Sequence, residues 1–253
     1  MESFARIIAD HITRADAAAT LERAEAAEER LRTRAMFLAM AEHQLKTPLT
    51  PLMGTSATLL DKWADTPDST KVELLAAVVG SARRLEGAID DLLVEARADN
   101  QALEVSMRRV EVGPFVELFV QAFGSVSPRH EILLDVQEGI AAWTDPALLY
   151  QVLGHLLDNA LKYSPDGGTV WIRSAATEKD VEIEIADEGV GLPKGIDVFE
   201  PFSQAAPRDG AGGGIGLGLH IVRTLVEAMR GSVTARPNED RGATFAVRVP
   251  RSR

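Results

Sequence analysis

The chain has 253 residues, 45% of them hydrophobic and 26% charged, with a formal net charge of -11 and no cysteine. This composition suits a globular protein with a real core and excludes disulfides, thiolate nucleophiles and Cys-ligated zinc. The acidic balance disfavours nucleic-acid binding, which needs a positive field. No apolar run approaches the roughly 20 residues of a membrane span, and the start lacks a signal-peptide layout. We therefore expect a cytoplasmic protein without membrane contact.

The first segment, residues 1–35, reads as a signalling helix. Side chains along a seam recur at spacings of three and four residues, two of them glutamates: Leu21, Ala24, Glu28, Leu31, Ala35, Leu38, Glu42 and Leu45. This heptad pattern predicts a parallel two-stranded coiled coil. A single solvated helix is the alternative.

A helical hairpin is predicted over residues 36–105. The seam runs into the polar break DKWADTPDST, which contains Pro67, and helical spacing then resumes. The apolar positions of the second helix are Leu75, Val78, Ala82, Leu85, Ile89 and Leu92. One hairpin cannot bury both apolar stripes, whereas two can do so as a four-helix bundle. We therefore expect a homodimer.

Residues 106–253 change period and predict a separate domain. Short alternating runs occupy residues 131–136, 169–175, 180–187, 232–236 and 243–249, and helical stretches occupy residues 114–124, 146–163 and 216–230. This mixture predicts an α/β sandwich, a mixed sheet with helices on one face. The expected fold class of the whole chain is α+β.

Three segments of this domain carry candidate binding groups. In DNALKYSP, Asn159 offers an amide oxygen suited to magnesium and Lys162 could meet a phosphate. The helix before it has Asp145 as a plausible N-cap and Pro146 at its first position. Without further context, a buried amide and a surface lysine explain this segment equally well.

The second segment, DEGVGLP, follows a predicted strand. A carboxylate at Asp187 can accept a hydrogen bond from the amino group of adenine, and glycines at Gly189 and Gly191 let a backbone approach the ring. An ordinary Asp-Gly turn is the alternative.

The third segment, GAGGGIGLGLHIV, runs into a helix. Gly214, Gly216 and Gly218 place free N–H groups at a helix N-terminus, where phosphates bind. A flexible linker is the alternative. Tyr163 and Leu217, which belong to the same segments as the groups above, complete the predicted nucleotide contacts.

Together, in this order, the three segments resemble the ATP-binding domain shared by histidine kinases, DNA gyrase, Hsp90 and MutL. The resemblance covers roughly residues 108–250. It implies that FEPFSQ is the box that precedes a nucleotide lid, and that Arg208 is the basic lid residue that meets phosphate. ATP and magnesium, held by Asn159, are the implied cofactors.

Upstream, FLAMAEHQLKTPLTPL resembles the phosphoacceptor box of sensor histidine kinases. His43 takes the place of the phosphorylated residue, and neutral imidazole has a free lone pair for attack on phosphorus. The resemblance implies autophosphorylation and phosphotransfer to an aspartate on a response-regulator receiver domain. Thr47, one turn later, lies where related kinases position water for dephosphorylating that aspartate.

Two residues depart from the family pattern. Gln44 replaces the usual acid, and an amide can orient the imidazole but cannot accept its proton at neutral pH. We therefore expect weak autokinase activity, with the phosphatase direction surviving or dominant. His155 stands where an asparagine is frequent, and either holds a magnesium-bound water or packs.

Three other interpretations compete with this one. A degenerate kinase that binds nucleotide as a scaffold is favoured by Gln44. An ATPase of the gyrase or Hsp90 kind is disfavoured by His155, because those enzymes carry a catalytic glutamate there. A serine kinase of the anti-sigma type is disfavoured by the phosphoacceptor box.

Overall fold

The computed structural model describes residues 28, 38–39, 41–99, 103–123, 129–193, 195–201, 203 and 217–252. The chain divides into two compact units, residues 1–90 and 91–253.

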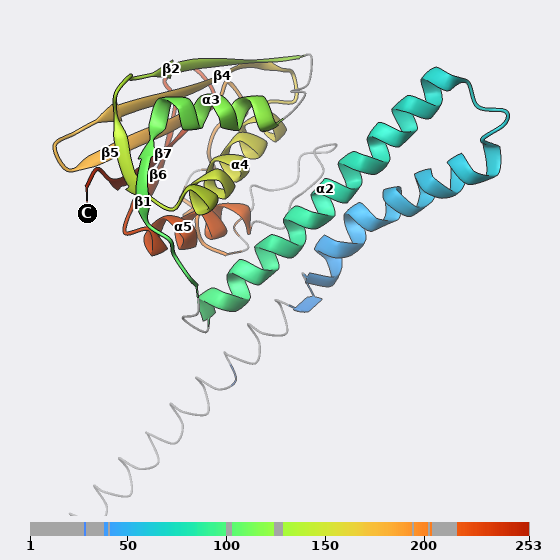
Figure 1. Cartoon of the computed structure of the whole chain (residues 1–253), viewed down its shortest axis with the longest axis horizontal. Helices are drawn as coiled ribbons and strands as arrows, with labels where there is room; N and C mark the ends of the chain where they lie inside the picture. Colours follow the sequence, from blue (N-terminus) through green and yellow to red (C-terminus); the bar gives the residue numbers. More distant parts are fainter. Residues whose placement is uncertain are drawn as a thin grey trace, which may run out of the picture. The chain divides into compact units, whose positions relative to one another are not determined.

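The first unit is a helical hairpin (Figure 1). A helix runs through residues 41–62, and α2 (Asp68–Asp99) begins directly after Pro67. The last residues of α2, from Asp91 onward, belong to the second unit. Asp68 lies in the first turn of α2, where a carboxylate favours the positive end of the helix dipole, and it also pairs with Lys71 at 2.9 Å. The predicted turn is therefore confirmed. The predicted coiled coil falls almost entirely outside the described residues.

The second unit is built on a five-stranded sheet with strand order β2-β4-β5-β7-β6. Its strands are β2 (His130–Val136), β4 (Gly168–Ala176), β5 (Asp180–Ala186), β6 (Ser232–Pro237) and β7 (Ala243–Pro250). β2 and β4 are parallel, and every other neighbouring pair is antiparallel. The sheet is thus mixed, as the alternating runs predicted.

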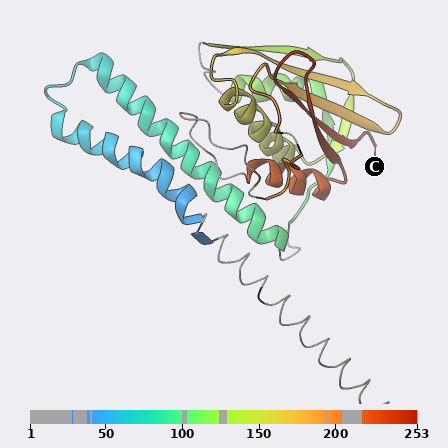
Figure 2. The ribbon, with the colours of Figure 1, turned by 180° about the vertical axis from the view of Figure 1, so that it is seen from behind.

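Three helices accompany the sheet: α3 (Val112–Phe123), α4 (Pro146–Lys162) and α5 (Gly218–Ala228). Figures 1 and 2 show α4 and α5 side by side on the same side of the sheet. Every second residue of β5 is buried (Val181, Ile183 and Ile185), as a period of two requires when one face packs on helices. The core therefore lies between the sheet and these helices.

Two short strands were not predicted. β1 (Arg108–Glu111) pairs antiparallel with β3 (Ala141–Thr144) as a separate two-stranded sheet. Both have four residues, too few to establish an alternating pattern. The α+β class, the hairpin and the sandwich with a mixed sheet are confirmed. None of the described helices is long and apolar enough to span a membrane.

Candidate functional site

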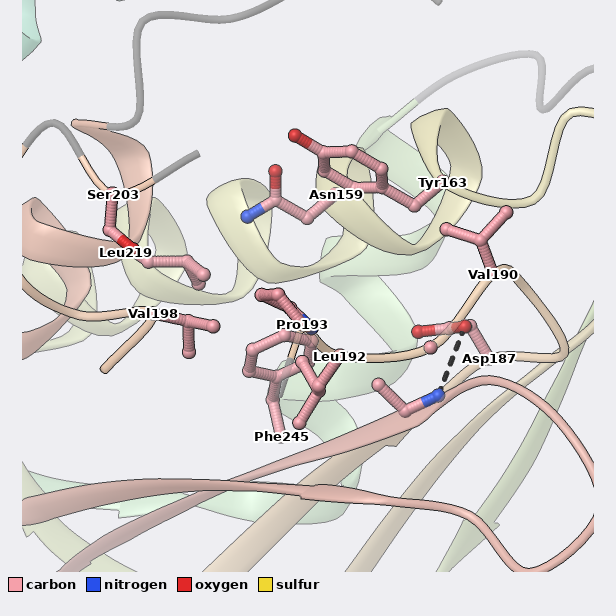
Figure 3. Close-up of a pocket in the computed structure, with 12 residues that line it drawn as sticks. Asn159, Tyr163, Asp187, Val190, Leu192, Pro193, Val198, Ser203, Leu219 and Phe245 are labelled. Carbon is pink, nitrogen blue, oxygen red and sulfur yellow. Dashed lines mark hydrogen bonds between the residues drawn. The ribbon is translucent and has the colours of Figure 1, made fainter. Parts of the chain in front are cut away.

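A pocket in the second unit opens between α4, the loop after β5 and the beginning of β7 (Figure 3). It is lined by Asn159, Tyr163, Asp187, Val190, Gly191, Leu192, Pro193, Val198, Ser203, Leu219, Ala243 and Phe245. Four of the predicted nucleotide contacts, Asn159, Tyr163, Asp187 and Gly191, therefore lie on one cavity. Its other walls are mostly apolar, as a planar base would require.

Helix α4 supplies the polar edge of the pocket. Its N-terminus is capped as predicted, because Asp145 accepts hydrogen bonds from the backbone N–H groups of Ala147 and Leu148. Asn159 and Tyr163 are four residues apart, so they project from one side of the helix, as Figure 3 shows. The cap fixes where α4 begins, and so contributes to the position of both side chains.

Asp187 is held at the end of β5 by backbone donors. Its Oδ1 accepts from Gly189 N at 2.8 Å and from Ala243 N at 3.2 Å. Within the described part of the chain Oδ2 receives no hydrogen bond, and Figure 3 shows a dashed line on only one of the two carboxylate oxygens of Asp187. Burial raises the pKa of this carboxyl, while those two hydrogen bonds oppose the shift. One oxygen is thus occupied and the other available to a donor on a ligand.

The glycines of the loop after β5 make close approaches. A Cβ on Gly189 would lie 2.3 Å from the carbonyl oxygen of Tyr163, so this glycine allows the loop to pack on the end of α4. Gly191 has φ +76°, and its Cβ would lie 3.3 Å from the carbonyl oxygen of Gly242. Gly191 lines the pocket, whereas Gly189 does not line it and instead packs against the end of α4.

Lys162 does not line the pocket, but it lies beside Tyr163, which does. Its ammonium group lies 5.2 Å from the centre of the Tyr163 ring. Burial lowers the pKa of Lys162, and the neighbouring charge of Asp158 opposes that shift. Burial raises the pKa of the Tyr163 phenol, and Asp158 adds to the increase. A phosphate beside Lys162 would favour its charged form.

The glycine-rich segment is described only from Leu217 onward. Arg208, Gly214 and Gly216 lie outside the described residues, as does Phe202. Leu217 is buried at the N-terminus of α5, which has no side-chain cap, and Gly218 is the first residue of that helix. The residue at the N-cap position, Leu217, has no side-chain acceptor, so it does not bond the N-terminal N–H groups of α5.

His155 packs against the start of α5. A Cβ on Gly218 would lie 3.5 Å from His155 Nδ1. On its other side, His155 Nε2 lies 2.9 Å from Oδ1 of Asp91, although the two groups are not aligned as a hydrogen bond. Of the two alternatives for this residue, the packing role has a contact that supports it.

The stretch that contains Asp197 and Phe199 is bonded to α5. Asp197 accepts two hydrogen bonds from Arg223, at 3.0 and 2.8 Å, and the guanidinium lies 4.9 Å from the centre of the Phe199 ring. Phe199 is buried and meets Phe245 edge to face at 6.3 Å. These contacts anchor one end of the segment that sequence assigns to the lid.

In the first unit, His43 is exposed on the helix over residues 41–62. The Thr47 hydroxyl is also exposed and donates to the His43 backbone carbonyl at 2.8 Å. Gln44 is half-buried, and its Oε1 is buried with no hydrogen-bond partner in the described part of the chain. The imidazole is therefore reachable from solvent, while the amide beside it turns inward.

Sequence reasoning missed most of the apolar lining. Leu192, Val198, Leu219, Ala243 and Phe245 line the pocket, yet they were assigned only to loops, helices or strands. For Ala243 and Phe245 the sequence contains a weak signal, because both lie at the start of a strand just after Gly242. The described residues contain no cluster of three or more His, Asp or Glu side chains able to hold a metal.

Two families match the chain. The family of histidine kinase-, DNA gyrase B- and HSP90-like ATPases matches residues 144–253, and the His kinase A (phosphoacceptor) domain matches residues 33–101. Sensor protein KdpD of Clostridium acetobutylicum is 30% identical over 91% of this chain and 26% of its own length. The probable sensor histidine kinase TcrY of Mycobacterium tuberculosis is 33% identical over 95% of this chain and 49% of its own.

Solved structures agree with these matches. Histidine kinase AdeS of Acinetobacter baumannii superposes with a TM-score of 0.61 and 25% identity, over 83% of this chain and 98% of that one. Full-length ShkA in complex with AMPPNP gives 0.59 and 26%, over 85% of this chain and 45% of that one. The chain spans less than half the length of the curated relatives named above. It contains the core of a sensor histidine kinase: a His kinase A phosphoacceptor domain followed by an ATP-binding domain.

Proposed function

We propose that the chain binds ATP in the pocket of its second unit, transfers the γ-phosphoryl group to His43, and passes it to an aspartate of a response regulator. The observation that carries the proposal is the combination of an exposed His43 in the phosphoacceptor region with Asp187 and Asn159 on one pocket. The relative ShkA was solved with AMPPNP, an analogue of ATP, which supports a nucleotide as ligand.

The lining of the pocket supports a role for each of its groups. The Oδ2 of Asp187, which receives no hydrogen bond from the described residues, accepts from the exocyclic amino group of adenine, and Val190, Leu192 and Phe245 bury the ring. Lys162, a flexible cation beside Tyr163, binds phosphate oxygens. Leu217 and Gly218 open α5, whose N-terminal N–H groups favour an anion. Arg208, Gly214 and Gly216 are proposed to complete the phosphate contacts.

Magnesium fits a site with a single protein ligand. Asn159 lines the pocket and carries an amide oxygen, and the described residues contain no cluster of three or more His, Asp or Glu side chains that could hold a metal. Magnesium is commonly held by one or two protein oxygens together with substrate phosphates and waters. When bound, the ion would neutralise charge on the phosphates. Phosphoryl transfer otherwise depends on positioning, since the protein contributes little covalent chemistry beyond the nucleophile.

In the transfer itself, a lone-pair nitrogen of His43 bonds to the γ-phosphorus while the bond to the bridging oxygen of ADP breaks. Gln44 cannot take a proton from the ring, so we propose that autophosphorylation is slow. The test is incubation with γ-labelled ATP, with His43→Ala as control. The label should be absent from the control, and should survive base but not acid, as a phosphohistidine does.

Restoring an acid sharpens this test. Gln44→Glu should raise the autophosphorylation rate by about 100-fold, the lower end of what a positioned base contributes. Nucleotide affinity, measured separately, should not change. An unaltered rate at unaltered affinity would show that the missing acid is not what limits the reaction.

The second candidate is a nucleotide-binding scaffold or phosphatase without autokinase activity, favoured by Gln44 and by Thr47. Thr47 is exposed one turn after His43, where its hydroxyl is within reach of a docked partner. Dephosphorylation of a phosphorylated regulator that persists in His43→Ala and is lost in Thr47→Ala would support it.

Dimerisation is proposed from the surface of the hairpin. Large apolar side chains are left exposed along it: Met53, Leu60, Trp63, Val72, Leu75 and Val79. Leu60 is 83% exposed and Val72 67%, so a single hairpin leaves much of its apolar surface in water. A second copy could cover that surface as a four-helix bundle. Sedimentation of the chain should therefore give the mass of a dimer.

A further inference from the structure

The turn between β6 and β7 reaches back over the end of β5, where Asp187 lies. Asn238 is half-buried in this turn, and its backbone N–H bonds to the Gly242 carbonyl at 3.1 Å. The side chain of Asn238 donates through Nδ2 to the backbone carbonyl of Asp187 at 2.8 Å. One residue outside the pocket lining therefore holds the main chain of the residue proposed to recognise adenine.

The orientation of the Asn238 amide is fixed by chemistry. A backbone carbonyl can only accept, so the group facing Asp187 must be the amide NH2. Its Oδ1 consequently faces the other way, where it accepts from the hydroxyl of Thr244 at 2.6 Å. Thr244 is buried, and it neighbours Ala243, whose N–H donates to Asp187 Oδ1. Asn238 thus bridges the two backbone segments that meet at Asp187.

We propose that Asn238 is a positioning residue for adenine selectivity, acting by holding Asp187 so that its Oδ2 faces the base. The inference rests on the proposed function, in which Asp187 accepts from the adenine amino group. The main chain of Asp187 is further bonded to β7, through its N–H to the Ala243 carbonyl at 2.9 Å. Without Asn238, the Asp187 carbonyl loses a donor, and the main chain that carries the carboxylate loses one of the contacts that hold it in place.

The result to expect is a loss of selectivity rather than a general loss of binding. Inosine diphosphate carries a carbonyl where ADP carries the amino group, so an accepting Oδ2 favours ADP and repels IDP. Asn238→Ala should weaken ADP binding about 3- to 10-fold, the range expected for one hydrogen bond. IDP binding should change by less than about 2-fold, because IDP does not use the interaction that Asn238 supports.

Calorimetric titration of the full chain with ADP and with IDP measures both affinities without phosphoryl transfer. Glu239→Gln is the matched control, because Glu239 is exposed on the same turn, and both affinities should be retained. Asn238→Asp is the second variant: it keeps the shape and the acceptor for Thr244 but cannot donate to the Asp187 carbonyl. It should also lower the preference for ADP, and it decides the matter if Asn238→Ala fails to fold.

Asp187→Asn separates failure of this inference from failure of the proposed function. If Asp187→Asn abolishes the preference for ADP while both Asn238 variants keep it, Asp187 recognises adenine and the positioning role is wrong. Equal weakening of ADP and IDP in the Asn238 variants would likewise overturn it, since that is what a merely structural residue gives. If Asp187→Asn keeps the preference, adenine recognition by Asp187 itself is refuted, and the positioning role with it.

Discussion

Gly242 should tolerate alanine much less well than another left-handed glycine of the same unit. Its φ is +88°, and an added Cβ would lie 1.9 Å from the carbonyl oxygen of Asp187 and 2.9 Å from its Oδ1. Gly139 has a comparable φ of +72°, but a Cβ there would meet no atom within 4 Å. The two substitutions therefore share the backbone cost and differ in the clash.

The backbone cost of alanine at such a position is about 1 kcal/mol. Alanine at position 242 would also force the main chain of Asp187 to move away, far enough to break the hydrogen bonds that join it to Asn238 and Ala243. Three hydrogen bonds are at risk, each contributing about 1 kcal/mol. We expect a loss of about 1 kcal/mol for Gly139→Ala and about 2 to 4 kcal/mol for Gly242→Ala.

The comparison can be made by thermal unfolding followed through tryptophan fluorescence. Trp143 and Trp171 both belong to the second unit, so a Trp63→Phe background confines the signal to it. An extra 2 kcal/mol corresponds to a further fall in Tm of about 4 to 8 °C. Equal losses in the two variants would refute the reasoning, because they would show that the approach of Gly242 to Asp187 imposes no constraint.

Three further predictions concern the same unit. Because burial raises the pKa of Asp187, the stability that this group contributes is complete below the ordinary aspartate pKa and is lost as pH rises through the raised value. Asp187→Asn should therefore be at least as stable as the parent chain at pH 7 while losing ADP selectivity, as urea unfolding and nucleotide titration can show. Burial lowers the pKa of Lys162, so as pH rises its ammonium group should lose its charge, and nucleotide affinity should fall, below the ordinary lysine pKa. Lys162→Arg should shift that fall to higher pH, because the guanidinium stays charged. Asp145→Ala should cost about 2 kcal/mol by urea unfolding, from the lost cap of α4 and the lost bond to the Ser106 N–H, whereas Asp145→Asn should cost less than half of that.

The elements that the sequence predicted well are those whose pattern is local. α4 carries its own cap at Asp145 and a long amphipathic repeat, and β4 and β5 alternate over seven or more residues. β1 and β3 carry neither signal. Their sequences, RRVE and AAWT, become strands only because each meets the other, a non-local contact that no window of sequence reports.

The residues of the candidate site differ in the same way, between those with a local signal in the sequence and those without one. Asn159 and Asp187 were found because their chemistry is specific and because each stands at the end of a recognisable element. Leu219 and Phe245 were missed because an apolar residue in a helix or strand has the same local pattern whether it faces the core or a ligand. Only the packing of α5 beside β7 shows that these two residues face the pocket rather than the core.

Asn238 shows why a supporting residue is harder to find than the group it supports. Asparagine in a turn is explained locally by its ability to bond its own backbone, and nothing in PNEDRG indicates a different use. Its two partners, Asp187 and Thr244, lie 51 and 6 positions away in the chain, and the longer of these contacts exists only because β5 and β7 are neighbours in the sheet. A residue whose role depends on register can be assigned only once that register is known, so the selectivity of this pocket has to be tested at the turn as well as at the carboxylate.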